Sequence, residues 1–148
     1  MGGFVALCAL MVVAGAGIPL MAGANAQLGT RLASPTTALL ILFTVGVIAS
    51  GVVALAVGMP SWDQIRAAPT PLFFAGLLVV FYVLAITFAA PRMGLGNAIF
   101  MVLLGQLIAA SLIDHFGVFA TPQPIEWTRV AGLVIMAVGV FLATHRPA

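Results

Sequence analysis

Apolar and polar residues fall in long blocks along this chain. Five runs of apolar residues, at about 3–28, 35–58, 71–90, 95–113 and 127–144, are separated by short polar breaks. A transmembrane helix needs about 20 consecutive apolar residues to cross the hydrocarbon core. The pattern therefore predicts an all-α membrane protein whose single domain, residues 1–148, contains five transmembrane helices.

Local signals mark some of the helix ends. Ser34-Pro35 predicts an N-cap followed by proline at the first helical position. Ser61 and Gln64 have capping-box spacing within the polar break 60–70. We expect this break to form a short turn at the membrane interface.

The first apolar run admits a second interpretation. Residues 1–26 end in Ala24-Asn25-Ala26, which is similar to a signal-peptidase site. A signal peptide begins with a positively charged region, however, and no Lys or Arg precedes this run. We therefore expect an uncleaved first helix.

Pro19 lies near the middle of that helix. It removes the hydrogen bond to the carbonyl of Gly15, so a kink or local unwinding is expected there. Transporters use broken helices to expose backbone to substrate, which makes Pro19 and Gly15 candidates for the solute pathway. A kink that serves only packing is the alternative. Asn25, farther along, is expected either to cap the helix or bond neighbouring backbone, or to contact solute.

Composition agrees with a membrane protein, because 64% of the residues are hydrophobic and 5% are charged. The pI near 9.5 reflects five arginines against three acids and predicts no nucleic-acid surface. Cys8 is the only cysteine, so no intrachain disulfide can form. The charges lie at or near the ends of the apolar runs: Arg31, Asp63, Arg66, Arg92, Asp114, Glu126, Arg129 and Arg146.

The fourth run holds the closest polar set in the apolar part of the chain, in the stretch GQLIAASLIDHFG at 105–117. On a helix, Gln106, Ala110 and Asp114 share one face, with Ser111 beside it. A polar face turned to hydrocarbon is costly, so it should look into protein or water. Our hypothesis is that it faces a central pathway.

Each polar residue of this region has a structural and a functional interpretation. Gln106 forms either an interhelical hydrogen bond or a solute contact. Asp114 either pairs with Arg129 or serves in coupling or gating, and His115 and Arg129 are further candidates for that role. Tyr82 is the only tyrosine, lies within the third run, and joins Gln106 and Ser111 as a pathway candidate.

Small residues recur every four positions in the second run. They would let another helix approach closely, so we assign packing and no chemistry to them. The stripe consists of Gly46, Ser50, Ala54 and Gly58.

No nucleotide-binding loop, metal-ligand spacing or nucleophile elbow is present, so the sequence predicts no cofactor, no metal site and no enzyme. His115 and His145 are isolated histidines at the ends of runs.

Arginines predict the orientation by a small margin. With five spans, Arg66 and Arg129 lie on one side and Arg31, Arg92 and Arg146 on the other, three against two. The positive-inside rule then favours a cytoplasmic C-terminus. So small a difference also permits both insertions, and two opposite copies would reproduce an inverted-repeat transporter.

Three stretches resemble the YdcZ-like branch of the drug/metabolite transporter superfamily: 18–32 (IPLMAGANAQLGTRL), 105–117 (GQLIAASLIDHFG) and 129–143 (RVAGLVIMAVGVFLA). AAPRMG at 89–94 also resembles it. The resemblance implies half of a ten-helix inverted-repeat architecture, which this branch encodes as single genes, adjacent pairs or fusions. Residues that match the family pattern are Asn25, Gln106, Ser111, Asp114, His115 and Arg129.

One position departs from that pattern. Relatives often carry Gln two residues after the proline of the first helix, whereas this chain has Met21. The resemblance therefore implies a less polar site. The related small multidrug resistance proteins use a glutamate in this helix, which has no acid here, so proton exchange by that route is not expected.

Together these patterns predict a secondary active transporter in the bacterial inner membrane that exports a small organic solute. We expect alternating access in an antiparallel homodimer, or in a heterodimer with a homologous five-helix protein. The expected partners are membrane lipid and solute, and not nucleic acid. The alternatives are a passive channel and an accessory subunit that packs against a larger partner.

Overall fold

The computed structural model describes residues 2–144 of the chain, so His145 and Arg146 lie outside the described residues. Contacts between Cα atoms divide the chain into two compact units, Met1–Arg92 and Met93–Ala148. Each unit is described by itself below.

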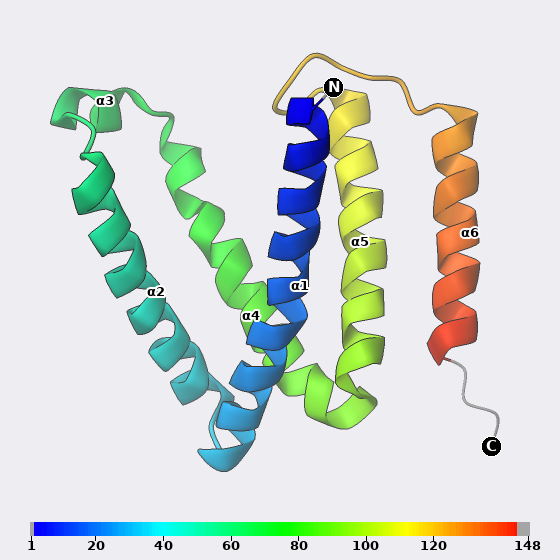
Figure 1. The fold of residues 1–148 in the computed structure, drawn as a ribbon, viewed down its shortest axis with the longest axis horizontal. Helices are drawn as coiled ribbons and strands as arrows, with labels where there is room; N and C mark the ends of the chain where they lie inside the picture. The colour runs from blue at the N-terminus through cyan, green and yellow to red at the C-terminus, as the bar shows by residue number, and fades with distance from the viewer. Residues whose placement is uncertain (1, 145–148) are drawn as a thin grey trace. The chain divides into compact units, whose positions relative to one another are not determined.

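The first unit contains helices α1 (Gly2–Arg31), α2 (Pro35–Val57), α3 (Trp62–Ala67), the 3-10 helix η1 (Thr70–Phe74) and α4 (Ala75–Met93), whose last residue opens the second unit. The second unit contains α5 (Leu95–Phe116) and α6 (Trp127–Thr144) (Figure 1). Five segments within the described range, namely α1, α2, η1 with α4, α5 and α6, are long and apolar enough to cross a membrane. The predicted five-span, all-α fold is confirmed.

Capping side chains fix two helix starts as the sequence predicted. Ser34 accepts a hydrogen bond from the backbone N–H of Thr37, and Pro35 opens α2. Ser61 and Gln64 form a complete capping box at the start of α3. The break between the second and third runs is therefore a short capped helix followed by η1, and not a simple turn.

Helix α1 runs through Pro19 without interruption, so the local unwinding, one of the two expectations, is wrong, and the kink stays a prediction. It also continues through Ala24-Asn25-Ala26 as regular helix. Proline removes only the N–H of its own position, and the remaining hydrogen bonds of a long apolar helix keep the backbone helical. The flanking Gly15 and Gly17 carry no side chain that could crowd the proline ring.

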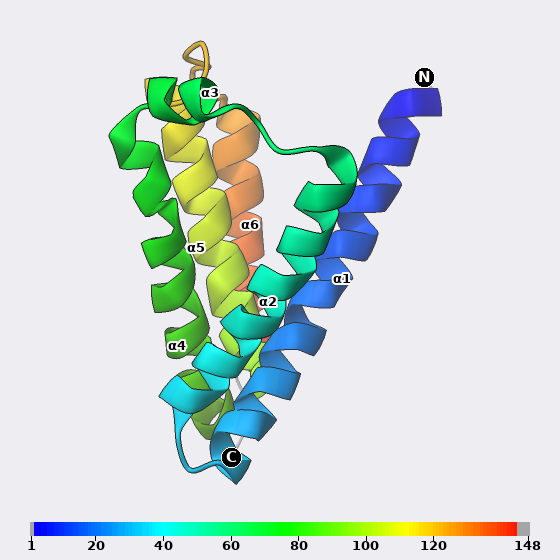
Figure 2. The ribbon, with the colours of Figure 1, turned by 90° about the vertical axis from the view of Figure 1, so that its left-hand side faces the viewer.

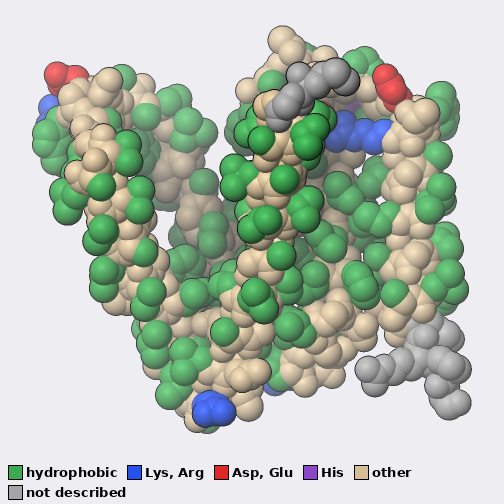
Figure 3. Space-filling model, in the orientation of Figure 1, with side chains coloured by type: hydrophobic (Ala, Val, Ile, Leu, Met, Phe, Trp, Pro, Cys, Tyr) green, Lys and Arg blue, Asp and Glu red, His purple; other side chains and the backbone are tan. Residues whose placement is uncertain are grey.

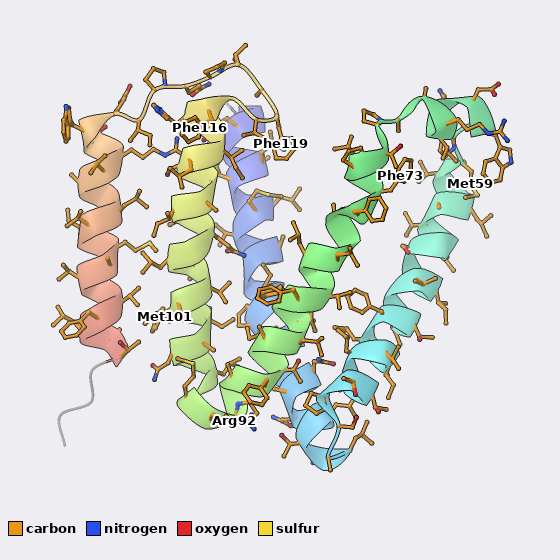
Figure 4. The ribbon with its side chains drawn as sticks, turned by 180° about the vertical axis from the view of Figure 1, so that it is seen from behind. Met59, Phe73, Arg92, Met101, Phe116 and Phe119 are labelled. Atoms are coloured by element: carbon orange, nitrogen blue, oxygen red, sulfur yellow. The ribbon has the colours of Figure 1, made fainter. Side chains whose placement is uncertain are left out.

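The third run ends later than predicted. Helix α4 continues past Ala90 through Pro91 to Met93, and Gly94, with φ of 88°, ends the run. The guanidinium of Arg92 donates to the carbonyl of Phe88 and lies 3.5 Å from the centre of its ring. Figure 4 shows Arg92 at the end of α4. The arginine side chain thus adds a hydrogen bond to a backbone carbonyl in the last turns of α4, as basic side chains near a helix C-terminus often do.

The core of the first unit lies where the C-terminal half of α1 meets the start of α2 and the C-terminal half of α4. At Gly29, an added Cβ would lie 3.0 Å from Cγ2 of Thr87 and 3.4 Å from Cα of Pro35, so a side chain of α4 and the backbone of α2 both pack against this glycine. Away from this point α1 and α2 diverge (Figures 1 and 2). The buried apolar residues of these helices are Ala22, Ala26, Ala38, Leu39, Val83, Ile86 and Ala90.

Apolar side chains cover the spans, and charged side chains gather near the helix ends (Figure 3). The N-terminal half of α1 and the C-terminal half of α2 are exposed almost throughout. In the second unit, α5 packs against α6. Such apolar exposed faces belong in contact with lipid or with another chain.

Candidate functional site

Asn25 and Thr87 form a buried hydrogen bond between α1 and α4. The amide Nδ2 of Asn25 donates to Oγ1 of Thr87 at 2.7 Å, and the two residues are 4% and 2% exposed. The expectation that Asn25 caps its helix is wrong, because α1 continues to Arg31. A buried amide inside a membrane span needs a partner, and a residue 62 positions away supplies it.

A hollow of about 220 Å³ opens between α1 and α2 beside this pair. Asn25 is the one polar residue of its wall, and the other lining residues are Met21, Ala24, Leu28, Ile41, Leu42 and Val45. Met21 and Asn25 lie one helical turn apart. Met21 therefore faces the same hollow as Asn25, as an apolar side chain.

The polar face of α5 is outward in this chain. Gln106, Ala110 and Asp114 are exposed, whereas Ser111 is 3% exposed and donates to the carbonyl of Leu107 at 2.8 Å. Gln106 makes no side-chain hydrogen bond to any described residue. The hydroxyl of Ser111 is thus hydrogen-bonded within its own helix, whereas the side-chain amide of Gln106 is available to bond a group outside the described residues.

Asp114 and Arg129 form an ion pair, which is the structural alternative stated for Asp114. Nη2 of Arg129 lies 2.8 Å from Oδ2 of Asp114, and the side chains are 39% and 47% exposed, respectively. The pair joins the last turn of α5 to the first turn of α6. It is held in a partly hydrated setting, where such pairs contribute little stability.

The loop between α5 and α6 folds back onto the end of α5. The N–H of Gln123 donates to the carbonyl of Asp114 at 2.8 Å, and that of Ile125 donates to Nδ1 of His115 at 3.4 Å. Gly117 adopts the left-handed conformation, with φ of 62°. His115 therefore holds the loop in place. Figure 4 shows Phe116 at the end of α5 and Phe119 in this loop.

Three further pathway candidates are not brought together. The hydroxyl of Tyr82 is enclosed and has no hydrogen-bond partner among the described residues. Pro19 is half-buried, and a Cβ added at Gly15 would meet no atom within 4 Å. Because α1 does not unwind, neither residue exposes backbone here.

The small-residue stripe of α2 has no neighbour in the described part of the chain at Gly46, where a Cβ would meet open space. Ser50 donates to the carbonyl of Val47 in its own helix, and Gly58 lies beyond the last residue of α2. Among residues 2–144, no group of three His, Cys, Asp or Glu side chains could hold a metal ion.

Sequence reasoning missed Thr87 and Gly29, the two residues that position Asn25. Gly29 follows Asn25 by one turn, and Thr87 lies on the buried face of α4 with Val83 and Ala90. The four-residue spacing of Asn25 and Gly29 could have predicted a helix-packing face on α1. It could not have predicted that α4 is the helix that packs there.

A family model described as "Putative inner membrane exporter, YdcZ" matches residues 6–142. Comparisons with curated proteins and with solved structures gave no match. The matched range includes all the site residues above, and the description of the family is that of a membrane exporter. With the five apolar helices found among its described residues, the chain is a multi-pass protein of the inner membrane. It belongs to the YdcZ family of inner-membrane exporters.

Proposed function

We propose that the protein is a secondary active exporter of a small organic solute that works by alternating access as an antiparallel dimer. The second half of the dimer is another copy or a homologous five-helix chain. The observation that carries this proposal is the environment of Gln106.

Gln106 lies 11 residues after the start of α5, about 16 Å along the helix axis and so near its middle. Its amide is exposed and unpartnered among the described residues, at a depth where lipid offers no hydrogen bonds. Several other polar side chains in the spans donate to a carbonyl of their own helix, namely Thr44, Ser50, Asn97, Ser111 and Thr144, and Asn25 pairs with Thr87, whereas the enclosed hydroxyl of Tyr82 has no partner among the described residues. Gln106 therefore calls for a second chain or a water-filled path.

An antiparallel dimer meets this need with two copies of one sequence. The small arginine difference permits both insertions, and the favoured one places the C-terminus in the cytoplasm. A pair of opposite copies would form an inverted repeat. Transporters of this plan bind solute at the interface between the repeats, near the bilayer midplane. Gln106 is at that depth. Asp114 serves as a partner of Arg129 in this scheme and not as the coupling acid.

Cysteine cross-linking tests the arrangement. In a Cys8→Ser background, Gln106→Cys lies at the same depth in two antiparallel copies. Ile99→Cys lies on the same face of α5 about two turns earlier, so it is displaced about 10 Å in opposite directions in the two copies. We expect disulfide cross-links at 106 and none at 99. Cross-links at both positions would indicate parallel copies, and none at 106 would remove this face of α5 from the interface.

Transport itself is tested in proteoliposomes by a solute screen with and without a pH gradient. Export that depends on the gradient supports the secondary active mechanism. Solute movement that never exceeds equilibration, with or without a gradient, would indicate a passive channel.

A further inference from the structure

We propose that the hollow between α1 and α2 binds an uncharged, mainly apolar solute that carries one hydrogen-bond donor, and that Asn25 Oδ1 accepts this hydrogen bond. The inference rests on the proposed transport function and names the class of substrate. It comes from three features of the hollow: the unpaired amide oxygen of Asn25, the absence of charged residues from the lining, and the apolar character of the other lining residues.

The two polar atoms of the Asn25 amide differ in their hydrogen bonding. Its Nδ2 donates to Thr87, and Oδ1 accepts no hydrogen bond from any described residue. The residue is 4% exposed, and what remains accessible borders the hollow. An amide oxygen at this depth retains its capacity to accept, and only a donor entering the hollow can use it.

The hollow offers no charge for a cation. Its wall contains no acid, and Asp63, the acid of the first unit, lies in α3, which does not line the hollow. Asn25 lies six residues before the end of α1, about 9 Å inside Arg31 along the axis. A bare cation would lose its hydration there without gaining a carboxylate, so the site disfavours organic cations.

The remaining wall is apolar and adaptable. Met21 is flexible and polarisable and suits flat apolar groups of differing shape, while Ile41, Leu42 and Val45 give an aliphatic surface. A volume of about 220 Å³ is small for a ligand pocket. A lipid chain would fit the apolar wall but would leave Oδ1 without a donor.

Two isomers separate these possibilities. 3-Methylindole has an N–H donor and 1-methylindole has none, although both have the same atoms and nearly the same shape. Binding is measured by equilibrium dialysis against the wild-type protein in nanodiscs, with empty nanodiscs subtracted. We expect 3-methylindole to bind about tenfold more tightly than its isomer, the usual effect of one buried hydrogen bond. Benzyltrimethylammonium, the cationic probe, should bind more weakly than either.

Matched variants of α2 locate the binding site. Val45→Trp fills the hollow and should abolish the preference for 3-methylindole, whereas Val47→Trp, on the same helix and outside the lining, should retain it. Ile41→Trp is a second filling variant if Val45→Trp fails to fold. Equal binding of the two isomers, tighter binding of the cation, or retention of the preference in folded filling variants would each overturn the inference.

Binding and transport are scored separately. A wild-type protein that exports some solute from proteoliposomes but shows no isomer preference would overturn this inference and leave the proposed function standing. An isomer preference that the filling variants abolish, in a protein that moves no solute, would support the site and overturn the proposed function.

Discussion

Arg129 Nη2 and Asp114 Oδ2 meet at 2.8 Å across the loop that links the last two spans. The contact assigns a structural partner to the acid that the sequence marked as a possible coupling group. Both side chains are more than one third exposed, so water screens their attraction.

The first prediction concerns this ion pair. Asp114→Asn should lower the free energy of unfolding by about 0.2–1 kcal/mol and leave gradient-driven transport intact. Exchanging the two residues, Asp114→Arg with Arg129→Asp, should restore part of the stability. Thermal unfolding and proteoliposome uptake measure the two effects, with Arg66→Gln as an arginine control in α3. Loss of gradient-driven uptake with retained solute exchange would instead assign coupling to Asp114.

The second prediction concerns the bond between α1 and α4. Asn25→Leu and Thr87→Val should each destabilise the fold, and the double variant should cost less than the sum of the two. The coupling energy from this cycle is expected to be about 0.5–2 kcal/mol. Thr44→Val is the matched control, because Thr44 bonds only within its own helix. Strictly additive effects would show that the two side chains do not interact.

The third prediction concerns Gln106. Gln106→Ala should abolish or redirect transport while the protein stays folded and dimeric, because the change removes a solute contact. Asn97→Ala, which removes an amide bonded to the carbonyl of Met93, should leave the solute profile unchanged. If Gln106→Ala lowers stability by about 1 kcal/mol and keeps the profile, Gln106 is an interhelical bond only.

The fourth prediction concerns Gly117. A Cβ at this residue would lie 2.6 Å from Cγ of Pro122 and 2.8 Å from the carbonyl oxygen of Ala120. Gly117→Ala also forces an L side chain into the left-handed region, which alone costs about 1–2 kcal/mol. Thermal unfolding should show a larger loss than for Gly105→Ala, whose Cβ would enter open space. Equal stabilities would mean that the loop does not pack against the end of α5.

The fifth prediction concerns insertion. Reporters for cytoplasm and periplasm fused to the C-terminus should both give signal, because the arginine difference is three to two. Arg31→Gln together with Arg92→Gln should reverse the small excess. A one-sided signal would restrict a homodimer to parallel copies and require a different chain as the antiparallel partner.

The sequence by itself determined the five spans and the capped starts of α2 and α3, and it offered the pairing of Asp114 with Arg129 as one of two alternatives. Each depends on a short stretch: hydrophobic length, a serine and its third neighbour, or opposite charges flanking one loop. Such signals are local, because they depend on residues close together in the sequence and not on how the helices pack. The end of α4 was misplaced because Pro91 is tolerated in the last turn, with Arg92 reaching back to Phe88.

Only the tertiary structure decided the partner of Asn25, the course of α1 through Pro19 and the hollow beside Met21. The spans are apolar on nearly every side, so periodicity does not distinguish a face that meets protein from one that meets lipid. The close approach at Gly29 brings Thr87 to Asn25 from 62 residues away. That contact depends on the fit between two helix surfaces, which no single stretch of the chain contains.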